Sequence, residues 1–122
     1  MANTIQLLYV DDEESLRILV KNQLVLEGFA VDVADDGDTA VDALKVKKYD
    51  VVLLDIRMPR MNGIEVLKYM KKNNIRPRVV MLTAVDDLAV AIEAVKTGAN
   101  DYVTKPYDLD NLLKCIHRVM AK

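Results

Sequence analysis

The chain has 122 residues, of which 52% are hydrophobic and 30% are charged, and this is enough for one domain with its own core. Its 17 Lys and Arg residues are dispersed among 19 Asp and Glu residues, which argues against direct binding of DNA or RNA. The lone Cys115 has no partner for an internal disulfide, the N-terminus lacks the pattern of a signal peptide, and no apolar run reaches the roughly 20 residues that cross a bilayer. We therefore expect a single cytoplasmic domain over residues 1–122, without a membrane partner.

Short apolar runs alternate with longer segments of helical spacing along the whole chain. The predicted strands are residues 5–10, 30–34, 51–54, 79–82 and 101–104. Each is followed by apolar residues at helical spacing, such as Leu16, Val20 and Leu24. Runs such as VVLL at 51–54 are apolar at every position, which is typical of parallel strands buried on both faces. The sequence thus predicts a doubly wound α/β domain of five βα units.

Polar residues follow four of these strands directly. Asp11 and Asp12 follow the first strand, Asp55 the third, Thr83 the fourth and Lys105 the fifth. Taken singly, these residues could be helix caps, strand ends or surface charges. In a doubly wound sheet, however, the carboxyl ends of the strands border one crevice, so we expect the five groups to converge there.

Three carboxylates in one crevice repel one another, and a pair about 4 Å apart costs roughly 4 kcal/mol at an effective dielectric near 20. One lysine cannot neutralise three negative charges, so the cluster calls for a divalent cation, and an all-oxygen site suits Mg2+. Asp55 ends a central strand and precedes a turn that leaves its carboxylate free, whereas Asp11 and Asp12 lie at a helix entrance. We therefore predict that Asp55 accepts a phosphoryl group whose oxygens contact Mg2+, Thr83 and Lys105.

Four motifs stand at or beside the predicted strand ends: YVDDE at 9–13, VVLLDIRMPRMNG at 51–63, MLTA at 81–84 and YVTKP at 102–106. Together they resemble the receiver domain of two-component response regulators. The resemblance implies a five-stranded parallel sheet of order 2-1-3-4-5 with helices on both faces. It also implies a phosphoacceptor in signal transduction rather than an enzyme, apart from any autodephosphorylation. The phosphoryl donor would be a sensor histidine kinase or a histidine phosphotransfer protein.

The resemblance also assigns roles to individual positions. Asp11, Asp12, Asp55 and the backbone carbonyl of Arg57 would hold Mg2+ in a receiver domain. In such a domain Val85, together with Arg57, would tune hydrolysis of the aspartyl phosphate. Because Val85 has no polar atom to orient a water molecule, we expect a phosphorylated state that lasts longer than it would with an acid or an amide at this position.

Three further residues would carry the conformational switch that the resemblance implies. Thr83 and Lys105 would sense the phosphoryl group, and Tyr102 would turn inward as Thr83 moves toward it. This movement would reshape the face made by the fourth helix, fifth strand and fifth helix, which output partners read. The peptide bond between Lys105 and Pro106 is implied to be cis.

Two exposed positions complete the expectations. Ile18 and Val25 lie away from the core face of the first helix and could dock the kinase. Cys115 is expected in the core and His117 at the surface or its edge.

Other functions fit the sequence less well. A haloacid-dehalogenase-type phosphatase needs a second Asp two residues after the nucleophile, where this chain has Arg57. A flavodoxin-like carrier needs a hydroxyl- and Gly-rich loop where this chain has DDEE, and the chain has no P-loop motif. A receiver-like module that works without phosphorylation should have lost one of the key acids. The output remains open between a separate effector protein and an attached output domain, with or without a phosphorylation-dependent dimer.

Overall fold

The computed structural model describes residues 4–121 as one parallel sheet covered by helices on both faces. The strands are β1 (Gln6–Val10), β2 (Ala30–Ala34), β3 (Val51–Asp55), β4 (Arg78–Thr83) and β5 (Asp101–Thr104). All neighbours pair in parallel, in the order β2-β1-β3-β4-β5. The predicted doubly wound fold and its strand order are therefore confirmed.

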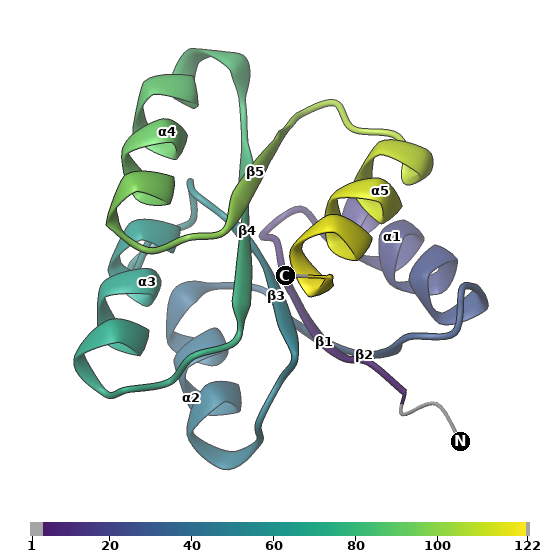
Figure 1. Cartoon of the computed structure of the whole chain (residues 1–122), viewed down its shortest axis with the longest axis horizontal. Coiled ribbons are helices and arrows are strands. Elements are labelled where there is room, and N and C mark those ends of the chain that lie inside the picture. The colour runs from purple at the N-terminus through teal and green to yellow at the C-terminus, as the bar shows by residue number, and fades with distance from the viewer. Residues whose placement is uncertain (1–3, 122) are drawn as a thin grey trace.

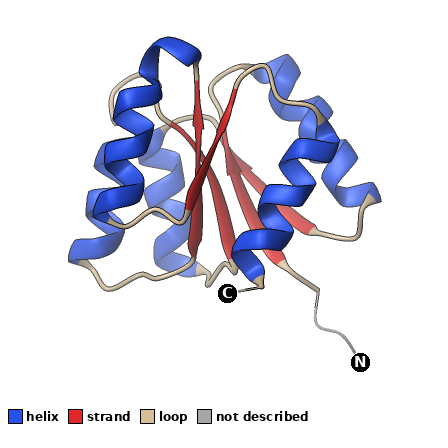
Figure 2. Cartoon of the chain, turned by 45° about the horizontal axis from the view of Figure 1, so that its top comes forward, coloured by secondary structure: helices blue, strands red, loops and turns tan. Residues whose placement is uncertain are grey.

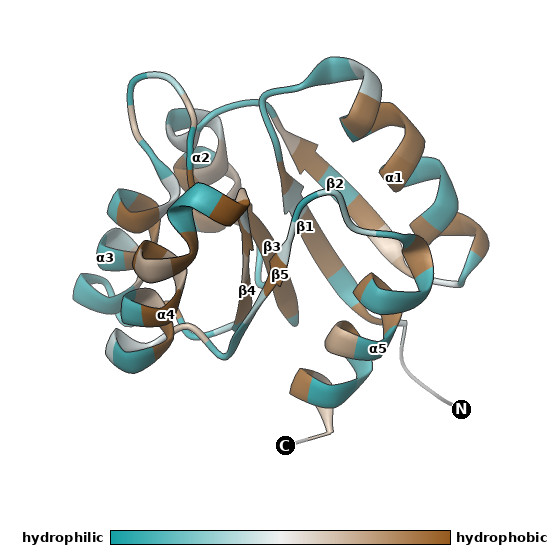
Figure 3. Cartoon of the chain, turned by 90° about the horizontal axis from the view of Figure 1, so that it is seen from above, coloured by the Kyte–Doolittle hydropathy of each residue, from teal (hydrophilic) through white to brown (hydrophobic). Residues whose placement is uncertain are grey.

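The helices form a layer on each side of the sheet (Figures 1 and 2). They are α1 (Glu14–Leu26), α2 (Gly37–Val46), α3 (Gly63–Lys72), α4 (Leu88–Thr97) and α5 (Leu109–Met120), with a 3₁₀ turn η1 (Val85–Asp87) before α4. One core cluster joins the sheet to α2, α3 and α4, and the other joins it to α1 and α5. Figure 3 shows hydrophobic residues along the strands and on the helices beside them.

Alternation along the strands divides the core between these two layers. In β1, Leu8 and Val10 pack toward α2, α3 and α4, whereas Leu7 and Tyr9 pack toward α1 and α5. Every residue of β3 is buried, as the continuous apolar run predicted. The strand that ends in Asp55 is therefore held on both faces and along both edges.

The observed strand ends differ slightly from the predicted ones. Asp55 and Thr83 are the last residues of β3 and β4, rather than the first residues after them. Their backbones still pair within the sheet, since Asp55 lies opposite Leu82 and Thr83 opposite Thr104. Both predicted site residues therefore stand on regular strand backbone.

Other expectations concern residues away from the crevice. Cys115 is buried with a free thiol, and His117 is exposed, as expected. Ile18 and Val25 are 54% and 49% exposed on α1. Among residues 4–121 no helix has the length and apolar character needed to span a bilayer.

Candidate functional site

Asp11, Asp12 and Asp55 meet at the carboxyl ends of β1 and β3. Each offers one carboxylate oxygen, and the three oxygens lie within 4.8 Å of one another. The side chains of Asp11 and Asp55 are buried, whereas that of Asp12 is exposed. The Nζ atom of Lys105 lies 3.1 Å from Oδ2 of Asp55 and 3.4 Å from Oδ2 of Asp11. The structure thus brings together the three acids and the lysine that the sequence placed at separate strand ends.

The cluster carries more negative charge than its lysine balances. Burial raises the pKa of Asp55 to about 6, and Asp11 and Asp12 add to this effect while Lys105 opposes it. Burial also acts against the charge on Lys105, but Asp55 and Asp11 outweigh it and raise the pKa of the lysine. The three carboxylates, of which only that of Asp12 is exposed, form an all-oxygen donor set that suits a hard divalent cation. The acids could therefore hold a metal ion.

The turn after Asp55 explains the glycine at its far end. The amide of Gly63, the first residue of α3, donates a hydrogen bond of 2.9 Å to the carbonyl of Ile56. A Cβ atom at position 63 would collide with the backbone carbonyl of Asp55, so only glycine lets α3 begin so close to β3. The left-handed residue of this turn is Arg60, with φ of 64°, and its side chain pairs with Asp36.

Asp11 is held by contacts on both carboxylate oxygens. Its Oδ1 accepts from the backbone amide of Glu13 at 3.0 Å, and its Oδ2 accepts from the hydroxyl of Tyr9, also at 3.0 Å. The hydroxyl of Tyr9 lies 2.8 Å from that of Tyr107. Burial raises the pKa of Tyr107 to about 12. The pKa of Tyr9 is also raised, mainly by burial and in second place by its hydrogen bond with Tyr107. Both phenols therefore keep their protons at neutral pH.

The contacts that the structure gives for Thr83 and Tyr102 are with groups other than the three acids. Thr83 is buried, and its hydroxyl donates to the backbone carbonyl of Ala84 at 2.9 Å. Tyr102, on β5, is partly buried and packs against the cluster on the α2, α3 and α4 side of the sheet. The peptide bond between Lys105 and Pro106 is cis, as the resemblance implied.

The loops after β3 and β4 are joined by an ion pair that sequence reasoning missed. Arg57 donates from Nε and from a terminal nitrogen to the two carboxylate oxygens of Asp87, at 2.6 Å each. Two aspartates, Asp86 and Asp87, follow the fourth strand closely, but nothing in their spacing identifies an arginine 30 residues earlier as the partner. Val85, which is expected to tune hydrolysis, is 68% exposed.

A hollow of about 500 Å3 opens over the acids. Its lining residues are Asp12, Asp55, Ile56, Arg57, Ala84, Asp86, Asp87 and Lys105. The lining does not include Val85, so the residues of this loop that border the hollow are Ala84, Asp86 and Asp87. The hollow therefore leaves Asp55 accessible between the loops after β3 and β4.

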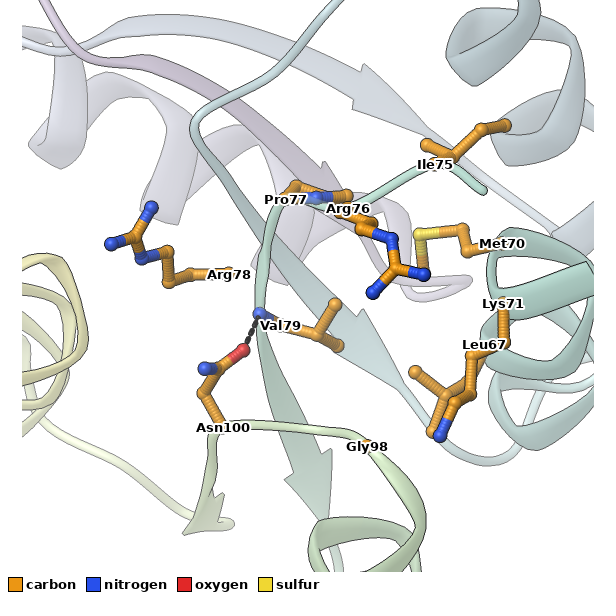
Figure 4. Close-up of a pocket in the computed structure, with 10 residues that line it drawn as sticks. All are labelled: Leu67, Met70, Lys71, Ile75, Arg76, Pro77, Arg78, Val79, Gly98 and Asn100. Carbon is orange, nitrogen blue, oxygen red and sulfur yellow. Dashed lines mark hydrogen bonds between the residues drawn. The ribbon is translucent and has the colours of Figure 1, made fainter. Parts of the chain in front are cut away.

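A hollow of similar size, about 540 Å3, lies at the opposite end of the sheet (Figure 4). Lys71 and Arg76 extend into it, whereas Arg78 points away on the other side of β4. A neighbouring hollow shares Arg76 and adds Lys45, Lys47 and Lys48. The basic residues are thus less dispersed in the structure than along the chain, but this end holds none of the three clustered acids.

Known proteins match this chain over most of its length. The model of the response regulator receiver domain matches residues 7–117. The chain is 35% identical over 116 residues to the chemotaxis protein CheY of Bacillus subtilis, covering 94% of this chain and 97% of that protein. Among solved structures, the receiver domain of the Francisella response regulator 1452 superposes with a TM-score of 0.89 at 32% identity, covering 97% of this chain and 98% of that one. The chain therefore belongs to the response regulator receiver domain family.

Some relatives are much longer than this chain. The regulatory protein AtoC of Escherichia coli is 41% identical over 115 residues, which are 94% of this chain and 25% of AtoC. The transcriptional regulatory protein YkoG of Bacillus subtilis is 35% identical over 116 residues, or 95% of this chain and 51% of YkoG. The chain thus spans a quarter of one relative and about half of the other.

Proposed function

We propose that this receiver domain acts in the cytoplasm and accepts a phosphoryl group on Asp55 from a histidine kinase or a histidine phosphotransfer protein. The observation that carries this proposal is the position of Asp55. Its buried carboxylate ends the central strand β3, 3.1 Å from Lys105 and within the cluster of three acids. Family membership supports the same chemistry.

In the proposed reaction, a carboxylate oxygen of Asp55 attacks the phosphorus of a phosphohistidine. A phosphorus–oxygen bond forms while the phosphorus–nitrogen bond of the donor breaks, and the donor imidazole leaves with the electron pair. Asp11, Asp12, Asp55 and the backbone carbonyl of Arg57 would hold Mg2+, which supplies positive charge for the phosphoryl oxygens. Lys105 would keep its place beside Asp55 and pair with one of those oxygens.

The conformational response would begin at Thr83. Its hydroxyl would leave the carbonyl of Ala84 and donate to a phosphoryl oxygen, because a charged acceptor forms the stronger hydrogen bond. Tyr102 would then turn inward, and the face of α4, β5 and α5 would change. A downstream effector protein, or an output domain joined to the receiver, would read that face.

The domain would meet its phosphoryl donor through α1. Ile18 and Val25 are about half exposed. They lie on a different face of α1 from the core residues Val20 and Leu24. An exposed apolar pair on the helix that follows Asp11 and Asp12 suits a docking surface for a partner that must bring a phosphohistidine to Asp55.

The direct test is intact mass after incubation with acetyl phosphate, with and without Mg2+, on wild type and Asp55→Asn. We expect a single phosphoryl adduct that requires Mg2+ and is absent from the variant. A folded wild-type protein that binds Mg2+ but gains no adduct would instead be an interaction module that works without phosphorylation. In that case the roles given to Thr83, Tyr102 and Lys105 would be withdrawn.

A further inference from the structure

A chain of hydrogen bonds runs from Asp11 to the loop between β5 and α5. Tyr9 lies in the middle of β1 and is 0% exposed. Its hydroxyl lies 3.0 Å from Oδ2 of Asp11 on one side and 2.8 Å from the hydroxyl of Tyr107 on the other. Tyr107 is partly buried and lines a surface hollow of about 390 Å3 together with Glu13, Leu16, Lys105 and Pro106. The chain therefore links a buried acid to the surface.

The number of hydroxyl protons determines which group donates and which accepts in each of these hydrogen bonds. An ionised carboxylate can only accept, so the hydrogen bond between Tyr9 and Asp11 uses the one hydroxyl proton of Tyr9. The oxygen of Tyr9 is then left to accept, and Tyr107 must be the donor to it. The hydroxyl of Tyr107 thus acts on Asp11 through the hydroxyl of Tyr9.

Core packing alone does not explain a tyrosine at position 9. A phenylalanine would fill the same space in the cluster toward α1 and α5 without burying a polar group. The buried hydroxyl is tolerated because it is bonded on both sides, and one of those bonds reaches an acid of the proposed metal site.

We propose that Tyr9 and Tyr107 are positioning residues that hold the carboxylate of Asp11 in the orientation needed for Mg2+. This inference rests on the proposed function, because it concerns the metal site of the phosphoryl-transfer reaction. Groups that hydrogen-bond to metal ligands fix the orientation of the ligand, and their loss commonly weakens metal binding about 10–100-fold.

The test is the Mg2+ dissociation constant, measured calorimetrically on wild type, Tyr9→Phe, Tyr107→Phe and the double variant. We expect Tyr9→Phe to weaken Mg2+ binding about tenfold. We expect Tyr107→Phe to weaken it less, by at least about twofold, because its effect passes through Tyr9. In the double variant Tyr107→Phe should add nothing, since the group through which it acts is already gone.

Tyr49→Phe is the matched control, because Tyr49 also donates from its hydroxyl to a carboxylate, that of Asp32 at 2.7 Å, away from the cluster of acids. Its Mg2+ affinity should equal that of wild type. Wild-type affinity in Tyr9→Phe, or additive effects of the two substitutions, would overturn the inference. The acetyl phosphate experiment tests the proposed function separately. If the wild-type protein binds Mg2+ but gains no adduct, the proposed function fails, whereas the positioning role of Tyr9 and Tyr107 is still decided by the Mg2+ dissociation constants.

Discussion

Arg57 and Asp87 form a two-pronged ion pair that ties the loop after β3 to the turn before α4. Asp87 is buried, whereas the side chain of Arg57 is 78% exposed. Both residues line the hollow above Asp55. The pair therefore fixes the loop that follows Thr83 relative to the loop that follows the predicted phosphoacceptor.

Breaking this pair should loosen the loop. The hydrogen bonds from Arg57 lower the pKa of Asp87 below its ordinary value of 3.8. The pair therefore stabilises the folded protein fully at pH values above 3.8. This stabilisation is lost as the pH falls through the lowered pKa and Asp87 is protonated in the folded protein. We expect Arg57→Gln to lower the free energy of unfolding at pH 7, with a difference from wild type that shrinks below pH about 4. Urea unfolding at both pH values measures this, with Arg76→Gln as an exposed control. Equal stability of Arg57→Gln and wild type at pH 7 would contradict the expectation.

Removing the charge of Asp55 should stabilise the protein when Mg2+ is absent. The pKa of Asp55 is about 6 in the folded protein, against an ordinary value of 3.8. The free energy of unfolding of the wild type therefore falls as pH rises from about 4 to about 6, because the unfolded chain loses this proton more readily than the folded one. Asp55→Asn should be more stable than wild type at pH 8, by up to roughly 3 kcal/mol before the lost contact with Lys105 is subtracted. The gain should vanish near pH 4. Urea unfolding across this range provides the measurement, and an unchanged difference at pH 4 and pH 8 would argue against a raised pKa.

Position 85 should set the lifetime of the phosphorylated form. Val85 cannot orient a water molecule, and because it is 68% exposed it can be replaced without disturbing the core. We expect Val85→Asn or Val85→Glu to shorten the lifetime of the phosphoryl adduct several-fold, with Val85→Leu unchanged. The decay of the adduct mass after removal of acetyl phosphate measures the rate. An unchanged rate in Val85→Asn would direct attention to Asp86, which lines the hollow over the acids.

The exposed residues of α1 should matter for a protein donor and not for a small one. We expect Ile18→Ala combined with Val25→Ala to slow phosphotransfer from a histidine kinase that phosphorylates the wild-type domain. The rate with acetyl phosphate should stay the same, because that donor needs no docking surface. Val46→Ala, an 85% exposed residue on α2, is the control for loss of surface apolar area. Equal slowing with both donors would point to damage at Asp55 instead of lost docking.

The sequence predicted those parts of the fold and site that depend on local pattern. The run VVLL gave a buried parallel strand, and the rule for strand ends then placed Asp11, Asp55 and Lys105 in one crevice. The place of each of these residues depends on the order and direction of the strands. Both can be inferred from the hydrophobic periodicity of the sequence and from the spacing of its predicted elements. The prediction needed no knowledge of side-chain orientation.

Contacts between distant side chains could not be read in this way. Tyr9 has the pattern of an ordinary strand residue, and its bond to Tyr107 joins residues 98 positions apart. The ion pair of Arg57 with Asp87 depends on the paths of two loops. Such contacts depend on rotamers and loop geometry, which leave no periodic trace in the sequence.

The burial of β3 also has a consequence for local opening of the structure. β3 lies between β1 and β4 with all of its residues buried, whereas β5 is an edge strand and all of its residues are partly exposed. Amide hydrogens of β3 should exchange with solvent only through global unfolding, whereas those of β5 should also exchange through smaller fluctuations. Asp55 stands on the first of these strands, and Tyr102 and Lys105 on or just after the second. The proposed phosphoacceptor is thus anchored on the strand that opens last, and the residues proposed to respond to it lie on or beside the strand that opens most easily.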